Sequence, residues 1–212
     1  ENELFNAGRQ MALLIEEADG PDAGIAYLQT FAGIGETQAV QLIVDRQQMM
    51  QRAGRDEDAY AMLNRALDQY PENESLRYHR ALVAVERDEL DVHEADMQIL
   101  LKLKPDNPHY NNTLGYTLLI TSDERLDEAR DLINKAHELK PEDPYILDSK
   151  GWLEYKLGHF ELALEYLFRA FELDRDAEIA AHIGEVYWVL GDQEKAREFW
   201  LEGDKIDPDN KT

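Results

Sequence analysis

One pattern of residues occurs twice near the end of this chain, and the second copy follows the first by 33 residues. Each copy has a small residue, then a Gly, then two more small residues and a closing Asp. Two antiparallel helices approach closely only where a crossing residue lacks bulk, and a Gly can take the left-handed conformation that ends a helix. The pattern therefore predicts one helical hairpin per copy. The positions are Gly151, Gly158, Ala163, Ala170 and Asp174 in the first copy, and Gly184, Gly191, Ala196, Gly203 and Asp207 in the second.

The same pattern continues toward the start of the chain. Three further hairpins are predicted from Gly54, Ala59, Ala66 and Pro71, from Ala81, His93, Leu100 and Pro105, and from Gly115, Ala129, Ala136 and Pro141. In the middle one His93 and Leu100 stand where small residues are expected, so we expect looser packing or slightly splayed helices there. The next hairpin is two residues longer than its counterparts, and we place this insertion in the turn 121–125.

A first hairpin departs furthest from the pattern, with helices expected at 2–17 and 24–31 and a close at Gly33-Ile34-Gly35. The sequence thus predicts an all-α chain of about twelve helices. Asn107-Pro108 and Asp143-Pro144 each combine an N-cap residue with a Pro suited to the first helical position. We expect one continuous array over 1–212, with repeats at approximately 1–35, 36–72, 73–106, 107–142, 143–176 and 177–210.

Charge restricts the partners. The chain has 22 Lys and Arg against 45 Asp and Glu, a net charge of -23. Nucleic acid and anionic lipid would be repelled, whereas basic partners would be attracted. Much of the acidity is expected on solvated helix faces and at helix N-termini. The chain contains no Cys, which excludes disulfides, thiolate zinc sites and a cysteine nucleophile.

The ends of the sequence indicate a fragment of a longer chain. It begins at Glu1 without a Met or signal peptide, no apolar run is long enough to span a membrane, and the closing Asp207-Pro208-Asp209-Asn210 is typical of the start of another helix. We expect the apolar side of the last helix, with Phe199 and Trp200, to face a missing cap. Self-association at this end is therefore an open alternative.

The whole chain resembles a tetratricopeptide-repeat (TPR) array, which implies a right-handed α-solenoid. Residues 107–210 are also similar to the C-terminal repeats of a family of Gram-negative outer-membrane lipoproteins. The segments that support this similarity are 114–118, 126–129, 144–152 and 178–186. The resemblance implies anchoring on the periplasmic side of the outer membrane, and an adaptor that brings cell-wall hydrolases to a carboxyl-terminal processing protease. A cytoplasmic location is the alternative.

In TPR proteins the first helix of each hairpin lines the binding groove, and aligning the small residues gives the corresponding positions here. They form an aromatic stripe with scattered acids, suited to a peptide or a partner helix. The alternative is that the rings only pack against the neighbouring hairpin. A carboxylate clamp is not expected, because these positions hold no basic cluster. The predicted protein-binding residues are Tyr78, Asn112, Tyr116, Asp148, Trp152, Tyr155, Glu185 and Trp188.

Other chemistry finds little support. Six His residues are spread over different hairpins without zinc-ligand spacing, and no phosphate loop or nucleophile elbow is present, so we expect no enzyme, metal or cofactor. Lys150 and Glu154 stand where sibling hairpins have apolar residues. Either the fifth hairpin is rotated or the two charges pair at its seam. The alternative to an adaptor is a structural module that self-associates through the array.

Overall fold

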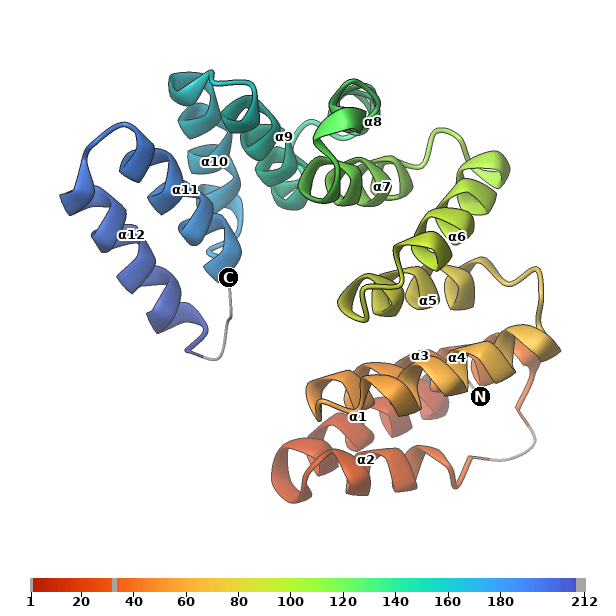
Figure 1. Cartoon of the computed structure of the whole chain (residues 1–212). Helices are drawn as coiled ribbons and strands as arrows, with labels where there is room; N and C mark the ends of the chain where they lie inside the picture. Colours follow the sequence, from red (N-terminus) through yellow and green to blue (C-terminus); the bar gives the residue numbers. More distant parts are fainter. Residues whose placement is uncertain (1, 32–33, 209–212) are drawn as a thin grey trace. The chain divides into compact units, whose positions relative to one another are not determined.

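A computed structural model describes residues 2–31 and 34–208 (Figure 1). Within these residues the chain forms twelve α-helices and one 3-10 helix, with no strand, which confirms the all-α prediction. The helices are α1 (Asn2–Asp19), α2 (Pro21–Leu28), α3 (Glu36–Arg52), α4 (Asp56–Gln69), α5 (Glu74–Glu86), α6 (Leu90–Leu103), α7 (Pro108–Thr121), η1 (Asp123–Arg125), α8 (Leu126–Leu139), α9 (Pro144–Lys156), α10 (Phe160–Leu173), α11 (Ala177–Val189) and α12 (Gln193–Ile206). None of the helices described here combines the length and hydrophobicity needed to cross a bilayer.

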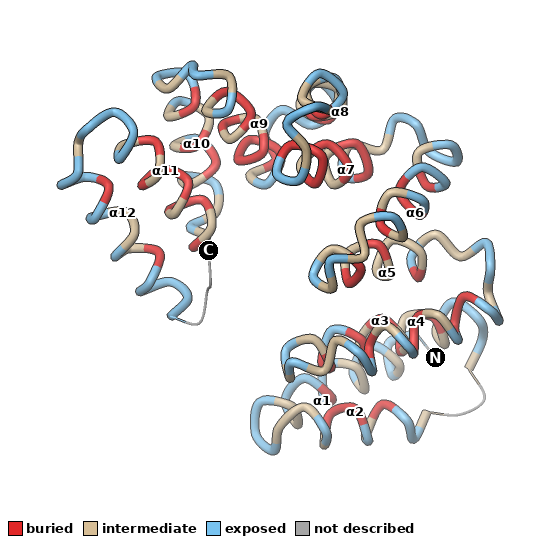
Figure 2. Tube along the Cα trace, in the orientation of Figure 1, coloured by how far each residue is buried: buried red, intermediate tan, exposed pale blue. Residues whose placement is uncertain are grey.

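The chain divides into two compact units, Glu1–Lys102 and Leu103–Thr212. In the first unit α1 packs with α2 and α3 with α4, while α2 contacts α3 and α4 contacts α5. In the second, the pairs α7–α8, α9–α10 and α11–α12 are hairpins, and α8 contacts α9 as α10 contacts α11. Buried residues accordingly lie on the helix sides that face a neighbouring helix (Figure 2). Each unit is thus built from hairpins stacked on hairpins.

The small residues allow close approach, as the sequence pattern predicts. A Cβ added at Gly115 would lie 2.8 Å from Ile133 Cγ1, and one at Gly151 would lie 2.6 Å from Leu167 Cγ. A Cβ at Gly184 would lie 2.4 Å from Trp200 Nε1. In all three hairpins of the second unit, the second helix therefore occupies the space that a side chain on the first would need.

The turns between paired helices depend on left-handed residues. Gly54, Gly158 and Gly191 have φ values of 67°, 81° and 87°. At the equivalent position of the third hairpin Asp88 adopts φ 59°, a conformation that favours Gly. The fourth hairpin has the 3-10 helix η1 instead, within the turn where the insertion was predicted.

Helix starts follow the predicted capping. Asn107 accepts hydrogen bonds from the backbone N–H of His109 and Tyr110, and Asp143 accepts them from Tyr145 and Ile146. Asp176 caps α11 in the same way. Each cap satisfies amide donors that a helix N-terminus leaves free.

The third hairpin is closed by polar groups. His93 and Leu100 are fully buried, and His93 Nδ1 lies 2.9 Å from the Ala81 carbonyl oxygen. The backbones of α5 and α6 approach each other less closely than those of the two helices in the other hairpins, as predicted from these larger residues, and the His93–Ala81 contact bridges the two helices.

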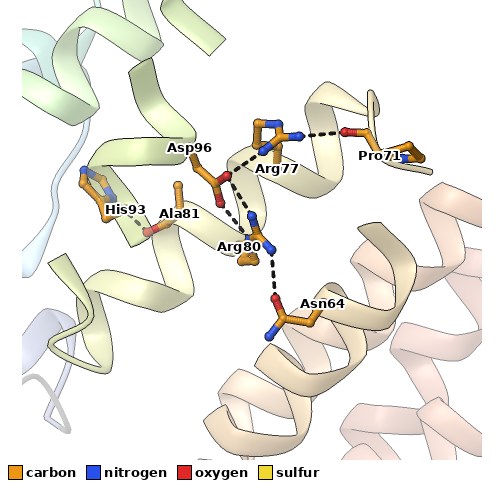
Figure 3. A network of polar contacts seen from close by, with 7 residues as sticks. All are labelled: Asn64, Pro71, Arg77, Arg80, Ala81, His93 and Asp96. Atoms are coloured by element: carbon orange, nitrogen blue, oxygen red, sulfur yellow. Dashed lines mark hydrogen bonds and ion pairs between the residues drawn. The ribbon is translucent and has the colours of Figure 1, made fainter. Parts of the chain in front are cut away.

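Asp96 on α6 lies at the centre of this network (Figure 3). Its side chain is 2% exposed and accepts hydrogen bonds from Arg77 Nη1 at 2.7 Å and from Arg80 Nε and Nη2 at 2.7 and 2.9 Å. Arg80 Nη1 also donates to Asn64 Oδ1 on α4 at 2.9 Å. The network therefore connects α4, α5 and α6, and it uses Arg77 and Arg80, which flank the predicted groove residue Tyr78 on α5.

The fifth hairpin pairs its charges, which is one of the two alternatives left open by the sequence. Lys150 Nζ donates to Glu154 Oε1 at 2.5 Å and to Asn134 Oδ1 at 2.8 Å, and His159 Nδ1 lies 2.8 Å from Glu154 Oε2. Burial opposes ionisation of Glu154, but the bonds from Lys150 and His159 outweigh it and lower the pKa of this carboxyl.

The first hairpin differs slightly from its prediction. α1 continues to Asp19, and α2 occupies Pro21–Leu28 in place of 24–31, because Pro21 can start a helix at once. Phe31 follows α2 and packs edge-on against Phe5. Of the predicted close, Gly33 lies outside the described residues.

Candidate functional site

The predicted groove residues all lie on first helices of hairpins. Tyr78 is on α5 of the first unit and is not part of the cluster described below. The other seven belong to the second unit: Asn112 and Tyr116 on α7, Asp148, Trp152 and Tyr155 on α9, and Glu185 and Trp188 on α11. Asp148 is buried and Trp188 is 43% exposed, whereas the others are half-buried.

Trp152 is the middle ring of an aromatic stack. Its ring centroid lies 4.6 Å from that of Tyr155 and 4.1 Å from that of His182, with interplanar angles of 22° and 20°. Tyr155 is one turn along α9, whereas His182 comes from the next first helix, α11. The stack therefore joins α9 to α11 and fixes the orientation of Trp152.

His182 connects the stack to a buried polar network. Its Nδ1 lies 2.8 Å from Asp148 Oδ1, and its Nε2 lies 3.5 Å from the hydroxyl of Tyr116, which donates to Glu178 Oε1 at 2.8 Å. Burial lowers the pKa of His182, but Asp148, with a smaller contribution from Glu178, outweighs burial and leaves this pKa raised. Burial and the same two carboxylates raise the pKa of Tyr116, so its hydroxyl remains a donor.

Trp200 on α12 forms a second aromatic surface. Its ring lies over Gly184, and its Nε1 donates to the Ala181 carbonyl at 3.3 Å. Trp188 packs against Trp200 with a centroid distance of 5.5 Å. Trp200 is half-buried and packs against α11. The Phe199 ring also packs inward, because its centroid lies 5.6 Å from that of Phe168 and 6.0 Å from that of Tyr187. Neither residue therefore simply projects from the end of the array.

These surfaces enclose a cleft of about 610 Å³ formed by residues of α9, α11 and α12. Its aromatic walls are Trp152, His182 and Trp200. The small residues Ala177, Ala181 and Gly203 give the cleft its depth. The carboxylates that complete its lining are Glu185, Asp204 and Asp207. Its volume is within the range of about 300–1,000 Å³ typical of ligand sites.

One carboxylate of the cleft, that of Glu185, is fixed by a hydrogen bond. Glu185 Oε1 accepts a hydrogen bond from the Tyr155 hydroxyl at 3.2 Å. Burial, followed by the charge of Glu185, raises the pKa of Tyr155, so this hydroxyl stays protonated and keeps donating. Among the described residues that line the cleft, none is Lys or Arg.

The structure thus brings four predicted residues, Trp152, Asp148, Tyr155 and Glu185, to the cleft or directly behind it. Tyr116 reaches the cluster through His182 and Glu178, while Trp188 only supports Trp200. Asn112 lies on α7, and its Oδ1 is buried without a hydrogen-bond partner.

Sequence reasoning missed His182, Trp200 and Asp204 as parts of one site. In the sequence His182 is only one of six dispersed His residues without zinc-ligand spacing. A signal for its role was present, because Asp148 and His182 occupy neighbouring positions of successive first helices. Within the described residues no group of three or more His, Cys, Asp or Glu could hold a metal ion.

Comparison with known proteins identifies the repeat. A family model described as tetratricopeptide repeat matches residues 149–211, which include all the residues that line the cleft. TPR repeat-containing protein PA4667 of Pseudomonas aeruginosa is 40% identical over 147 residues, covering 69% of this chain and 25% of that protein. TPR repeat-containing protein MJ1428 of Methanocaldococcus jannaschii is 31% identical over 106 residues, covering 50% of this chain and 18% of that protein. The chain therefore spans a quarter or less of the length of these relatives.

Solved structures share the fold at low identity. TTC0263, a thermophilic TPR protein of Thermus thermophilus, aligns with a TM-score of 0.70 and 20% identity, covering 80% of this chain and 92% of that one. A TPR protein of Parabacteroides merdae aligns with a TM-score of 0.68 and 14% identity, covering 95% of this chain and 79% of that one. PilF of Pseudomonas aeruginosa aligns with a TM-score of 0.64 and 19% identity, covering 84% of this chain and 80% of that one. This chain has the fold of the tetratricopeptide-repeat solenoid proteins, and residues 149–211 carry their repeat.

Proposed function

We propose that this chain is a non-enzymatic adaptor that binds a protein partner through the cleft between α9, α11 and α12. The observation that carries the proposal is the cleft itself, in which two Trp rings and several carboxylates lie beside small residues. Trp side chains are enriched among residues that dominate binding energy, because they bury large areas at low cost in conformational entropy. A TPR scaffold is consistent with this role.

The second part of the proposal concerns the partner. The similarity of residues 107–210 to an outer-membrane lipoprotein family supports a role in recruiting cell-wall hydrolases to a carboxyl-terminal processing protease on the periplasmic side. The 40% identity to a Pseudomonas aeruginosa TPR protein is compatible with a Gram-negative origin, and the name of that protein specifies no partner. Compartment and partner are thus proposed on resemblance.

A binding assay with purified proteins tests this function. The carboxyl-terminal processing protease and a cell-wall hydrolase from the source organism are each passed over the immobilised chain and over its Trp152→Ala variant. The adaptor function predicts saturable binding of at least one of them and a weaker response on the variant. No binding of either protein to the folded chain would contradict the proposed partners.

A further inference from the structure

The cleft corresponds to a surface that is occupied by a helix one repeat earlier. Ala181, Trp200 and Gly203 are equivalent, 33 residues back, to Asp148, Leu167 and Ala170. Those three residues contact α11: Asp148 binds His182, while Leu167 and Ala170 belong to the same hydrophobic cluster as Ile179 and Ile183 of α11. The geometry of the cleft is therefore that of a helix-binding surface.

The chemistry of this surface changes between the two repeats. Glu185 and Asp204 of the cleft stand where the earlier surface has Trp152 and Phe171. Trp152, which stacks on His182 of α11, and Phe171, which packs against the cluster that contains Ile179 and Ile183 of α11, are thus replaced by carboxylates, while Asp207 keeps the acidic character of Asp174. A helix that fits this cleft therefore meets carboxylates where α11 meets aromatic rings, and cationic side chains suit these places.

We infer that the cleft binds a basic amphipathic helix of a protein partner, with an Arg or Lys side chain inserted between the aromatic walls. The inference rests on the proposed adaptor function and names the chemistry of the partner. The methylene groups of an inserted side chain contact the rings of Trp152 and Trp200, and its charged end meets Glu185 and Asp204. Apolar residues on the same helix face cover Ala177, Ala181 and Gly203.

Charge distinguishes this occupant from a second copy of the chain. At -23 net charge, two copies repel each other, and each would bring further carboxylates to an acidic cleft. A basic helix instead pairs with these carboxylates, and a guanidinium stacks favourably on a Trp ring. His182 adds no unpaired positive charge, because its Nδ1 is directed to Asp148 at 2.8 Å.

The test uses a blocked 15-residue helical peptide of Ala, Leu and Arg, with the Leu residues on one face and Arg residues flanking them. A second peptide carries citrulline, which is neutral and similar in shape, at every Arg position. Binding to the 212-residue chain is followed through the indole N–H resonances of its three Trp residues. The Arg peptide is expected to bind at least about tenfold more tightly than the citrulline peptide and to shift the Trp152 and Trp200 resonances most.

Charge-removing variants locate the contact. Glu185→Gln and Asp204→Asn are each expected to weaken Arg-peptide binding by about three- to tenfold, and to leave the citrulline peptide unaffected. Glu172→Gln is the matched control, since Glu172 is an exposed acid on α10 that does not line the cleft. It removes the same charge and should leave both peptides unaffected.

Several results would overturn the inference. Equal affinity for the Arg and citrulline peptides, equal effects of Glu185→Gln and Glu172→Gln, or resonance shifts that spare Trp152 and Trp200 would each do so. A dimer that buries Trp200, seen by analytical ultracentrifugation, would assign the cleft to a second copy. A longer form of the protein that buries Trp200 and no longer binds the Arg peptide would assign it to the protein's own adjoining segment.

The inference and the proposed function can fail separately. If the protease or the hydrolase binds through Trp152 while the two peptides bind alike, the adaptor function stands and the basic helix is wrong. If the Arg peptide binds as expected and neither protein does, the cleft chemistry stands and the proposed partners are wrong.

Discussion

Two buried polar networks differ in what lies next to them. In the third hairpin, Asp96 is enclosed by Arg77 and Arg80, whose guanidinium groups donate hydrogen bonds to Asp96, Asn64 and the Pro71 carbonyl. In the fifth and sixth hairpins, the Asp148–His182 pair supports a Trp152 ring that lines a cleft. Buried polar groups occur in both, but only the second network supports a surface that a partner can reach. Adjacency to a cleft, rather than burial of charge, therefore marks the candidate site.

The largest expected effect is at the enclosed network. Asp96→Ala leaves two arginines without their carboxylate partner and should lower the free energy of unfolding of the first unit by about 3–5 kcal/mol. Urea denaturation measures this, with Asp91→Ala on the exposed side of α6 as the control. A loss below about 1 kcal/mol would show that water replaces the carboxylate at little cost. Peptide binding at the cleft should not change in the variant that remains folded.

A second prediction concerns the wall of the cleft. Gly184→Ala places a Cβ 2.4 Å from Trp200 Nε1, so the ring must move and its hydrogen bond to Ala181 must break. We expect a loss of about 1–3 kcal/mol in unfolding free energy, together with a shift of the Trp200 indole resonance. Gly203→Ala is the control, because the added Cβ would lie 3.2 Å from its nearest neighbour, the Ala177 carbonyl oxygen, and so needs a smaller adjustment. Equal effects of the two substitutions would mean that Trp200 adjusts freely.

The third prediction uses pH. The folded pKa of His182 is raised, so its ion pair with Asp148 stabilises the fold fully below the ordinary His pKa of about 6.5. This contribution is lost as pH rises through the raised folded pKa. Thermal melts should therefore show the second unit weakening above about pH 6.5, with a smaller effect than Asp96→Ala. Asp148→Asn should weaken this dependence of the melting temperature on pH. An unchanged pH profile in this variant would show that the His182–Asp148 pair does not cause it.

The smallest expected effect is an increase in stability at the turn of the third hairpin. Asp88 adopts φ 59° where the second, fifth and sixth hairpins have Gly, so Asp88→Gly should raise the unfolding free energy of the first unit by up to about 1 kcal/mol. Asp88→Ala should not stabilise, because Ala tolerates positive φ no better. If Asp88→Gly destabilises the unit, the aspartate side chain contributes more than the turn conformation costs.

The repeat pattern predicted most of the fold because it records steric requirements that are local. Gly151 and Gly184 must be small and Asn107 and Asp143 must cap, so these positions can be read from spacing alone. The site was predicted only in part. Trp152 and Glu185 follow from the groove positions, but the part of His182 depends on a side-chain contact between successive first helices.

Trp200 illustrates the same limit. It belongs to a second helix, outside the positions that usually line a TPR groove, and it reaches the cleft only because Gly184 leaves room for its ring. The polar closure of the third hairpin around Asp96 was missed for a similar reason. The pattern marks His93 and Leu100 as too large, but not the hydrogen bonds that accommodate a large residue.

The most direct test of the central claim compares two tryptophans with both binding and stability measured. Trp152 lines the cleft, whereas Trp188 lies outside it and is 43% exposed. Trp152→Ala should weaken binding of the Arg peptide by roughly 1–3 kcal/mol, and it should cost less in stability than the roughly 3–5 kcal/mol of a fully buried Trp. Trp188→Ala should change binding by less than about 1 kcal/mol. A Trp152→Ala protein that is strongly destabilised, yet still binds the peptide normally where folded, would contradict the account, since the ring would then be core rather than part of a binding site.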